Sequence, residues 1–283
     1  MPAWDADEVL SAAADALEAH ERALIAEQAV YGLEALDETD AHPVLAAGLA
    51  VVGRHGCRVL REQPYPSQWL AKRGRKRALP QGPDRLRCDL ALLPYDAADL
   101  DASGAPRCTP CLADTLRIAH GVADHKRRRA GTLFEGAHEP GIDDFDPAQP
   151  NAALPLSAPA PGERVVASTE AYWLEVKLVG QHCYRDGVPG PNTRYASELT
   201  RGVIADLRKL RRQDGIAPGA RGVLLVVLCA ERGVMEGDTA ILVHRCLDRG
   251  VGVRWPRVTG FAVPDRIGNR WCGLALLEPT AAD

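Results

Sequence analysis

Residues 171–179 read AYWLEVKLV, an apolar run interrupted by two charged side chains, and the whole fold is best understood outward from it. Its aromatic and β-branched content predicts a β-strand. Side chains alternate between the faces of a strand, so Glu175 and Lys177 point one way and Val176 points the other. Charges inside a buried strand are costly unless they are compensated. The run therefore predicts either a functional site or a mutual ion pair between Glu175 and Lys177.

A second strand-like run, RLRCDLALL at residues 85–93, repeats the anomaly with Asp89 at its centre. If the two strands are neighbours, Asp89 and Glu175 approach to metal-ligand distance and offer the hard oxygen ligands that Mg²⁺ prefers. A purely structural ion pair between Glu175 and Lys177 would leave Asp89 without an evident partner. The two strands together favour a metal site.

The rest of the chain predicts alternating helices and strands. Helical spacing is found in residues 5–36, as one helix or two, and in residues 44–54, where His42-Pro43 opens a helix that Gly56 closes. Further helices are expected at 192–212 and 240–249, and further strands at 57–63, 221–230, 258–263 and 269–277. The succession of strand, helix and strand from residue 171 to 230 implies a right-handed parallel crossover.

Residues 94–168 are the least regular part of the chain, with a single helix expected at 112–128. A connection of this length is uncommon inside a compact domain, so it predicts an insertion with its own small unit or a mobile flap. The chain then divides into residues 1–93, with the N-terminal helices and first core strands, the insertion 94–168, and residues 169–283, with the remaining core and C-terminal strands.

The insertion contains Cys108-Thr109-Pro110-Cys111, which resembles half of a zinc site. His120 and His125 follow on the expected helix, and thiolates with imidazoles suit tetrahedral Zn²⁺. The gap from cysteine to histidine is shorter than in ordinary zinc fingers. A redox pair or a plain structural turn therefore remains an alternative to structural zinc.

Composition places limits on the class of protein. The chain has 283 residues, 46% hydrophobic and 25% charged, which excludes a disordered chain. No apolar run approaches the roughly 20 residues that span a bilayer, and the first ten residues are acidic, so no membrane partner and a cytoplasmic location are expected. In that reducing compartment most of the eight cysteines are expected to be buried hydrophobic residues.

The formal net charge of -4 is not that of a protein that coats nucleic acid. Basic residues are nevertheless clustered, and local clusters can hold a phosphate backbone. The clusters are Lys72, Arg73, Arg75, Lys76 and Arg77, then residues 126–129, then Arg208, Lys209, Arg211 and Arg212. Plain solvated faces are the alternative interpretation.

Four segments together resemble the core of the PD-(D/E)xK, or restriction-endonuclease-like, nucleases. They are RCDLALL with Asp89, WLEVKLV with Glu175-Val176-Lys177, the helix TRYASELTRGVIADLRKL and the strand GVLLVVL. The resemblance covers roughly residues 34–93 and 170–230. It implies a mixed α/β sheet flanked by helices, in the order helix, three strands, helix, strand. Cys88 stands where the family usually has proline, and the long separation between the second and third core strands requires the insertion.

The resemblance also implies roles for particular residues. Asp89 and Glu175 would ligate Mg²⁺ or Mn²⁺, the backbone carbonyl of Val176 would contribute, and Lys177 would orient or help to deprotonate the attacking water. Many members add a glutamate from the N-terminal helix, and here Glu38 is preferred to Glu34 because it directly precedes the expected helix. Gln181 lies where some members keep a polar site residue.

The function implied by the resemblance is a metal-dependent nuclease that hydrolyses phosphodiester bonds of nucleic acid, expected to be DNA, in restriction, repair or defence. One alternative is an inactive nuclease-fold module that binds nucleic acid or a partner protein. Another is a subunit of a larger assembly or a homodimer, with the insertion docking a partner. The complete set of Asp89, Glu175 and Lys177 favours the enzyme, because a degenerate binding module has no reason to keep all three.

Overall fold

The computed structural model describes residues 4–66, 87–112, 162–213 and 215–280. Its helical elements are α1 (Ala6–Ala26), η1 (Leu33–Ala35), α2 (Glu38–Leu49), η2 (Ala97–Asp99), α5 (Tyr195–Ser197), the π-helical η4 (Glu198–Gly202), α6 (Val203–Arg211) and α7 (Arg232–Asp248). Its strands are β1 (Cys57–Pro64), β2 (Arg87–Pro94), β3 (Thr109–Leu112), β4 (Glu163–Val166), β5 (Tyr172–Gly180), β6 (His182–Arg185), β7 (Val188–Pro191), β8 (Arg221–Cys229), β9 (Arg257–Ala262) and β10 (Trp271–Leu277).

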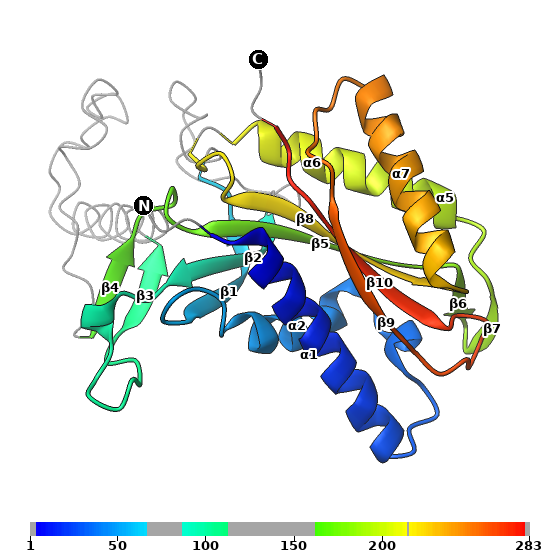
Figure 1. Ribbon diagram of the computed structural model, residues 1–283, viewed down its shortest axis with the longest axis horizontal. Helices are drawn as coiled ribbons and strands as arrows, with labels where there is room; N and C mark the ends of the chain where they lie inside the picture. The colour runs from blue at the N-terminus through cyan, green and yellow to red at the C-terminus, as the bar shows by residue number, and fades with distance from the viewer. Residues whose placement is uncertain (1–3, 67–86, 113–161, 214, 281–283) are drawn as a thin grey trace, which may run out of the picture.

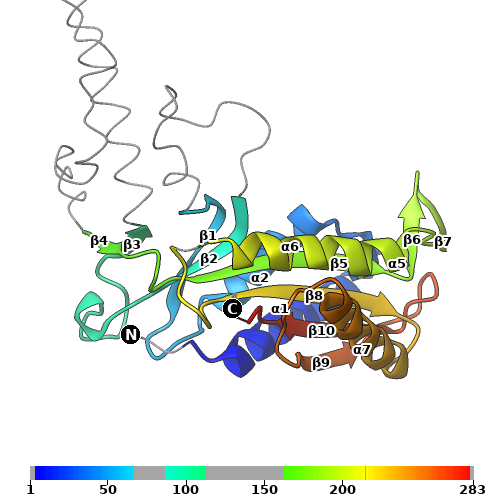
Figure 2. The same ribbon diagram turned by 90° about the horizontal axis from the view of Figure 1, so that it is seen from above.

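A six-stranded mixed sheet in the order β1-β2-β5-β8-β10-β9 forms the centre of the molecule (Figure 1). Neighbouring strands are antiparallel except β5 and β8, which are parallel and are joined by α5, η4 and α6. The predicted mixed α/β class is confirmed, as is the parallel pairing of the strands at 171–179 and 221–230. Two small sheets, β3-β4 and β6-β7, lie at opposite ends of the large one (Figures 1 and 2).

Helices cover both faces of the large sheet, and the alternation of β5 shows which residues each face receives. Leu174 and Val176 pack in one apolar cluster with residues of α1 and α2. Trp173 and Val179 pack in a second cluster with residues of α6 and α7. Because Glu175 and Lys177 alternate in register with this second set, they point toward the side that α6 covers.

The ladder between β2 and β5 is short, and its end positions the charged residues. It consists of Leu90↔Leu174, Ala91↔Trp173 and Leu92↔Tyr172, whereas β1 and β2 stay paired as far as Pro64↔Arg87. Continuing the β2-β5 register by one step would set Asp89 opposite Glu175, but the backbone pairing has already stopped. The two strands therefore separate at Asp89, and the space between them is the fork referred to below.

The start of α2 differs from the sequence prediction, which placed the helix at residues 44–54. The helix begins at Glu38, because the side chain of Asp37 caps it by accepting a hydrogen bond from the backbone N–H of Asp40 at 2.8 Å. Pro43 lies inside the helix, where its missing N–H removes a single helical hydrogen bond. The stretch predicted helical at residues 5–36 ends at Ala26 and resumes only as the short η1.

Two further elements were misjudged from the sequence. The last long helix begins at Arg232 instead of residue 240, because Gly233 and Gly237 lower helix propensity but face open space, where glycine is tolerated. The β6-β7 hairpin was not predicted, although Asp186-Gly187 at its turn, both with positive φ, is a recognised hairpin signal. The predicted core strands agree with the observed ones to within about two residues at each end.

The inserted segment, as far as it is described, contributes β3 and β4, which pair parallel outside the large sheet. The helix predicted at 112–128 lies outside the described residues except for Leu112, which ends β3. Within the described part of the chain, no helix is both long and apolar enough to cross a bilayer. All eight cysteines are free, and five of them are buried, as the sequence predicted.

Candidate functional site

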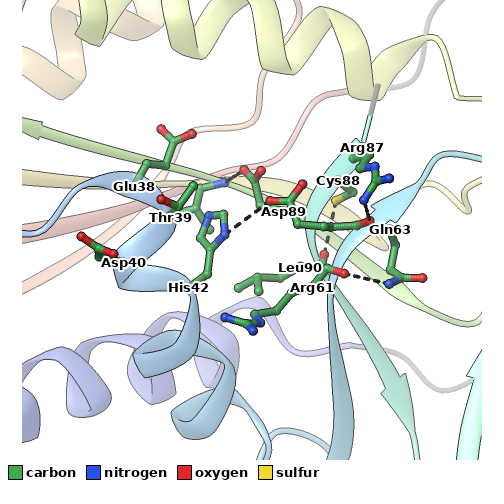
Figure 3. A network of polar contacts seen from close by, with 12 residues as sticks. Glu38, Thr39, Asp40, His42, Arg61, Gln63, Arg87, Cys88, Asp89 and Leu90 are labelled. Atoms are coloured by element: carbon green, nitrogen blue, oxygen red, sulfur yellow. Dashed lines mark hydrogen bonds and ion pairs between the residues drawn. The ribbon is translucent and has the colours of Figure 1, made fainter. Parts of the chain in front are cut away.

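Asp89 lies at the fork and bonds to the strand from which β2 has separated. Its Oδ2 accepts a hydrogen bond from the backbone N–H of Val176 at 2.7 Å (Figure 3). A side chain thus replaces the backbone partner that the ladder no longer supplies. The N–H and C=O of a strand residue project to the same edge, so the carbonyl of Val176 also faces the fork. The structure therefore brings together Asp89 and Val176, two of the predicted metal ligands.

Glu175 is only 2% exposed and is held by residues from two other elements. The ammonium of Lys209, on α6, lies 2.8 Å from its Oε1, and the hydroxyl of Tyr65 donates a hydrogen bond to the same oxygen. Burial, and then the charge of Asp89, raise the pKa of Glu175 to about 8, while Lys209 opposes that shift. The carboxyls of Asp89 and Glu175 thus lie close enough to repel each other.

Lys177 has different partners from the one that the sequence suggested. Its Nζ lies 3.0 Å from Oε2 of Glu38 and 3.4 Å from Oδ2 of Asp206. Burial alone would lower the pKa of Lys177, but Asp206 and Glu38 outweigh burial and raise it. The alternative of a mutual Glu175–Lys177 ion pair is therefore wrong: Glu175 is paired with Lys209, and Lys177 with Glu38 and Asp206.

The two candidate glutamates near the N-terminal helices, Glu38 and Glu34, make different contacts. Glu38 is the first residue of α2 and reaches Lys177, and burial raises its pKa even though Lys177 acts in the opposite direction. Glu34 accepts a hydrogen bond from Gly32 N at 3.1 Å and pairs with Arg266 at 3.4 Å. The structure thus places Glu38, and not Glu34, against the predicted site.

Gln181, which the resemblance suggested as a polar site residue, makes its side-chain hydrogen bond away from the fork. Its side-chain oxygen accepts a hydrogen bond from the backbone N–H of Ala230 at 3.0 Å. It therefore ties the end of β5 to the end of β8. That position gives it a structural role four residues beyond Lys177.

Three residues of the site, Tyr65, Asp206 and Lys209, were not identified from the sequence. Asp206 and Lys209 are three residues apart on α6, whose helical spacing, read together with Leu207 and Leu210, would have placed them toward the sheet. Lys209 had been counted in a basic cluster, but its ammonium is turned toward Glu175. Tyr65 follows β1 and gave no signal in the sequence.

Two arginines of that basic cluster, which keep their charge, are held by backbone carbonyls. Arg208 and Arg211 donate hydrogen bonds to the carbonyls of Arg249 and Gly250, both at 2.9 Å. The other two predicted clusters, at residues 72–77 and 126–129, lie outside the described residues. The predicted phosphate-binding role stays a prediction for all three clusters.

A second group of ligand-type side chains surrounds Asp89 on the α2 side of the fork. One ligand atom from each of His42, Glu62 and Asp89 lies within 4.8 Å of the other two. Figure 3 shows His42 on α2 pointing toward Asp89. Among the residues that the structure describes, no other group of three or more His, Cys, Asp or Glu side chains has its ligand atoms this close together.

Cys108 and Cys111 make separate hydrogen bonds in the described structure. The thiol of Cys108 donates to Asp99 Oδ1 at 3.0 Å, and that of Cys111 to the carbonyl of Arg164 at 3.2 Å. The hydrogen bond to Asp99 raises the pKa of the Cys108 thiol, and burial raises that of Cys111, so both thiolates are disfavoured. His120 and His125 lie outside the described residues, so structural zinc stays a prediction.

Several carboxyl groups gather near the fork, although among them only Asp89 belongs to the group of three or more ligand atoms that lie within 4.8 Å of one another in the described residues. Asp89, Glu175, Glu38 and Asp206 supply carboxyl groups, against the ammonium groups of Lys177 and Lys209. Burial, and after it the charge of Asp89, raises the pKa of Glu175, and the charge of a divalent cation would act in the opposite direction. Oxygen ligands of this kind suit Mg²⁺ or Mn²⁺. Glu175 would have to exchange its contacts with Lys209 and Tyr65 for the cation.

The protonation of Glu175 leads to a testable dependence of stability on pH. Its pKa in the folded protein, about 8, lies above its ordinary value of 4.5, so the folded state keeps a proton that the unfolded state loses. The stability due to that proton is fully present below pH 4.5 and is lost as the pH rises through 8. Glu175→Gln removes this titration. We expect its advantage over the wild type in free energy of unfolding to grow by a few kcal/mol from pH 4.5 to pH 9, since one pKa unit corresponds to about 1.4 kcal/mol.

Urea unfolding at a series of pH values measures this difference. Glu27→Gln, at an exposed position that follows α1, serves as the matched control and should run parallel to the wild type. Parallel profiles for Glu175→Gln and the wild type would show that Glu175 has no raised pKa in the folded protein.

Comparison with known proteins does not add a family to these observations. No protein-family model matches the chain, and the searches of curated proteins and of solved structures found no significant match. The functional argument therefore depends on the residues and their geometry.

Proposed function

We propose that this protein is a divalent-metal-dependent nuclease with a restriction-endonuclease-like core, acting on phosphodiester bonds of DNA. The observation that carries the proposal is the fork between β2 and β5. There Asp89 binds the backbone of Val176, next to the buried Glu175, and Lys177 follows on the same face of β5. Two carboxyls, a strand carbonyl and a lysine thus converge from residues that are far apart in sequence.

The arrangement of elements supports the same proposal. A helix, three strands β1, β2 and β5, a helical segment and the parallel strand β8 follow one another in the order that the nuclease core requires. The additional residues lie between β2 and β5, where the resemblance needs an insertion. Strands β10 and β9 extend the sheet beyond that core.

The chemistry asks for a cation and a protonated lysine. When bound, a divalent cation lowers the pKa of water and offsets the charge that develops on the phosphate. Asp89 and Glu175 would hold it, and Glu38 keeps the ammonium of Lys177 beside them. Because its neighbours raise the pKa of Lys177, that side chain stays protonated at neutral pH. Its role is then to stabilise negative charge and orient the phosphate, and not to act as a base.

An exposed arginine beside the fork suits a polyanionic substrate. Arg61 on β1 and Arg87 on β2 are both exposed, but Figure 3 shows the side chain of Arg61 directed away from Asp89. Neither has an ion-pair partner among the described residues; Arg87 donates only to the carbonyl of Glu62, at 3.4 Å. The guanidinium group of Arg87 can therefore contact phosphates that approach the site.

Cleavage of defined nucleic acids by the purified protein tests the proposal. We expect cutting of plasmid, linear or single-stranded DNA in Mg²⁺ or Mn²⁺, and none in EDTA. Ca²⁺ should support binding of labelled DNA, measured by fluorescence anisotropy, with little or no cutting, because it is larger and less demanding in geometry. Binding without cutting in every divalent cation would favour the inactive binding module, and inertness toward all nucleic acids would overturn the proposal.

A further inference from the structure

We infer that His42, Glu62 and Asp89 form a second divalent-cation site, which has a nitrogen ligand and takes a transition-metal ion such as Mn²⁺ in preference to Mg²⁺ or Ca²⁺. Ligand atoms of the three side chains lie within 4.8 Å of one another. The site shares Asp89 with the proposed nuclease centre but does not include Glu175. Whether this site binds a cation does not depend on whether the protein cuts nucleic acid.

The buried imidazole of His42 is the observation that points to a ligand. Its side chain is only 4% exposed, and its Nε2 has no hydrogen-bond partner among the described residues. Its Nδ1 lies 3.7 Å from Oε1 of Glu62, beyond hydrogen-bonding distance. Buried polar atoms are nearly always partnered in proteins. An imidazole that faces two carboxylates without a hydrogen bond is suited to bind a cation.

Each ligand is brought to this position by a particular feature of the backbone. His42 lies one helical turn beyond Glu38 on α2, so both side chains face the fork. Glu62 lies opposite Asp89 in the β1-β2 register, between the pairs Arg61↔Leu90 and Gln63↔Cys88, and has a φ of 53°. That left-handed conformation is rare for a residue other than glycine and interrupts the alternation of β1. It lets the Glu62 carboxylate approach His42.

Asp89 can take part without losing its structural hydrogen bond. Its Oδ2 accepts from the N–H of Val176, and its Oδ1 has no hydrogen-bond partner among the residues that the structure describes. Ligands of one ion with bonds of about 2.1 Å lie at most about 4.2 Å apart. The three ligand atoms lie within 4.8 Å of one another, so the side chains would have to move closer together, by rotation about their side-chain bonds, to share an ion.

The donor chemistry decides which cations the site prefers. Imidazole nitrogen is bound well by first-row transition metals, whereas Mg²⁺ and Ca²⁺ prefer sites made of oxygen alone. One nitrogen and two carboxylates therefore favour the transition metals. Mn²⁺ is the probe of choice, because its electron spin reports both its binding and the nuclei of its ligands.

Electron paramagnetic resonance on the full chain tests the site. In a Mn²⁺ titration we expect a bound ion whose electron spin-echo envelope shows modulation from a coordinated ¹⁴N nucleus. His42→Gln should abolish that modulation and weaken Mn²⁺ binding at least about tenfold. His244→Gln, at an exposed position of α7, is the matched control and should retain both. Glu62→Gln should weaken Mn²⁺ binding but keep the ¹⁴N signal of the remaining bound ion.

The outcomes separate this site from the nuclease proposal. Glu175→Gln should keep the ¹⁴N signal even where it stops cleavage. Absence of ¹⁴N modulation in the wild type, or modulation that survives in folded His42→Gln, would overturn the second site. If His42→Gln does not fold, unchanged Mn²⁺ affinity in Glu62→Gln would overturn it as well. Equal affinities of Mg²⁺ and Mn²⁺ for this site in a competition titration would contradict the preference for transition metals.

Discussion

Replacing Lys177 by methionine should lower the rate of DNA cleavage by about 10²–10³-fold, while the protein still binds Mg²⁺ or Mn²⁺. Methionine preserves much of the length of the side chain and removes only its charge. The loss of one positive group directed at the developing negative charge costs about this much in other enzymes. Cation binding should persist or tighten, because an ammonium group near the site opposes the metal. Single-turnover cleavage at saturating metal, with calorimetric titration of the cation, measures the two effects separately.

The other lysine of the site, Lys209, provides the contrast. Lys209 pairs with Glu175, whose side chain is 2% exposed, whereas Lys177 pairs with Glu38, whose side chain is 33% exposed. Lys209→Met should therefore cost the larger part of the stability, up to about 3–5 kcal/mol, at a pH high enough to ionise Glu175 in the wild type. A mutual Glu175–Lys177 ion pair, the alternative to a functional site in the sequence analysis, would instead have placed that cost on Lys177. Lys177→Met protein that is fully active, or that loses metal binding together with activity, would contradict the role given to Lys177.

Local periodicity accounts for the part of the fold that the sequence predicted well. The alternation in residues 171–179 correctly placed Glu175 and Lys177 on one face of a strand, and the apolar run at 221–230 correctly predicted a strand buried on both faces. Both patterns depend only on neighbours along the chain. The pairing of β2 with β5, which the sequence analysis gave only as the condition for a metal site, is observed over three residue pairs.

The partners of the charged residues could not be predicted, because they are long-range. Tyr65 reaches Glu175 across 110 positions in the sequence, and Lys177 reaches Glu38 across 139. No local pattern specifies which lysine meets which carboxylate. The Glu175–Lys177 pair, the alternative to a functional site, is not observed for this reason, whereas the preference for Glu38 over Glu34 agrees with the observed contacts.

The wrong start of α2 also concealed His42. Proline is common in the first turn of helices, so His42-Pro43 was interpreted as a helix start. With the helix beginning at Glu38, His42 is one turn further on and faces the same side. The position of Glu62 could not be predicted for another reason: its positive φ departs from the alternation that a strand pattern assumes.

The central claim is tested most directly by the cleavage rate of Asp89→Asn protein beside the wild type in Mg²⁺. The asparagine oxygen can still accept the hydrogen bond from Val176, so the fold should be retained, and thermal unfolding should shift little because a repulsive neighbour of Glu175 is removed. Without the charge of Asp89 the cation is held poorly, and we expect cleavage to fall at least about 10³-fold, or about 4 kcal/mol in the activation barrier.

Asp40→Asn provides the control, because Asp40 is an exposed aspartate on the helix that carries Glu38. It should cut DNA at the wild-type rate. The account predicts a folded Asp89→Asn protein that has lost cleavage beside an active Asp40→Asn protein. Cleavage by Asp89→Asn at the wild-type rate would contradict it.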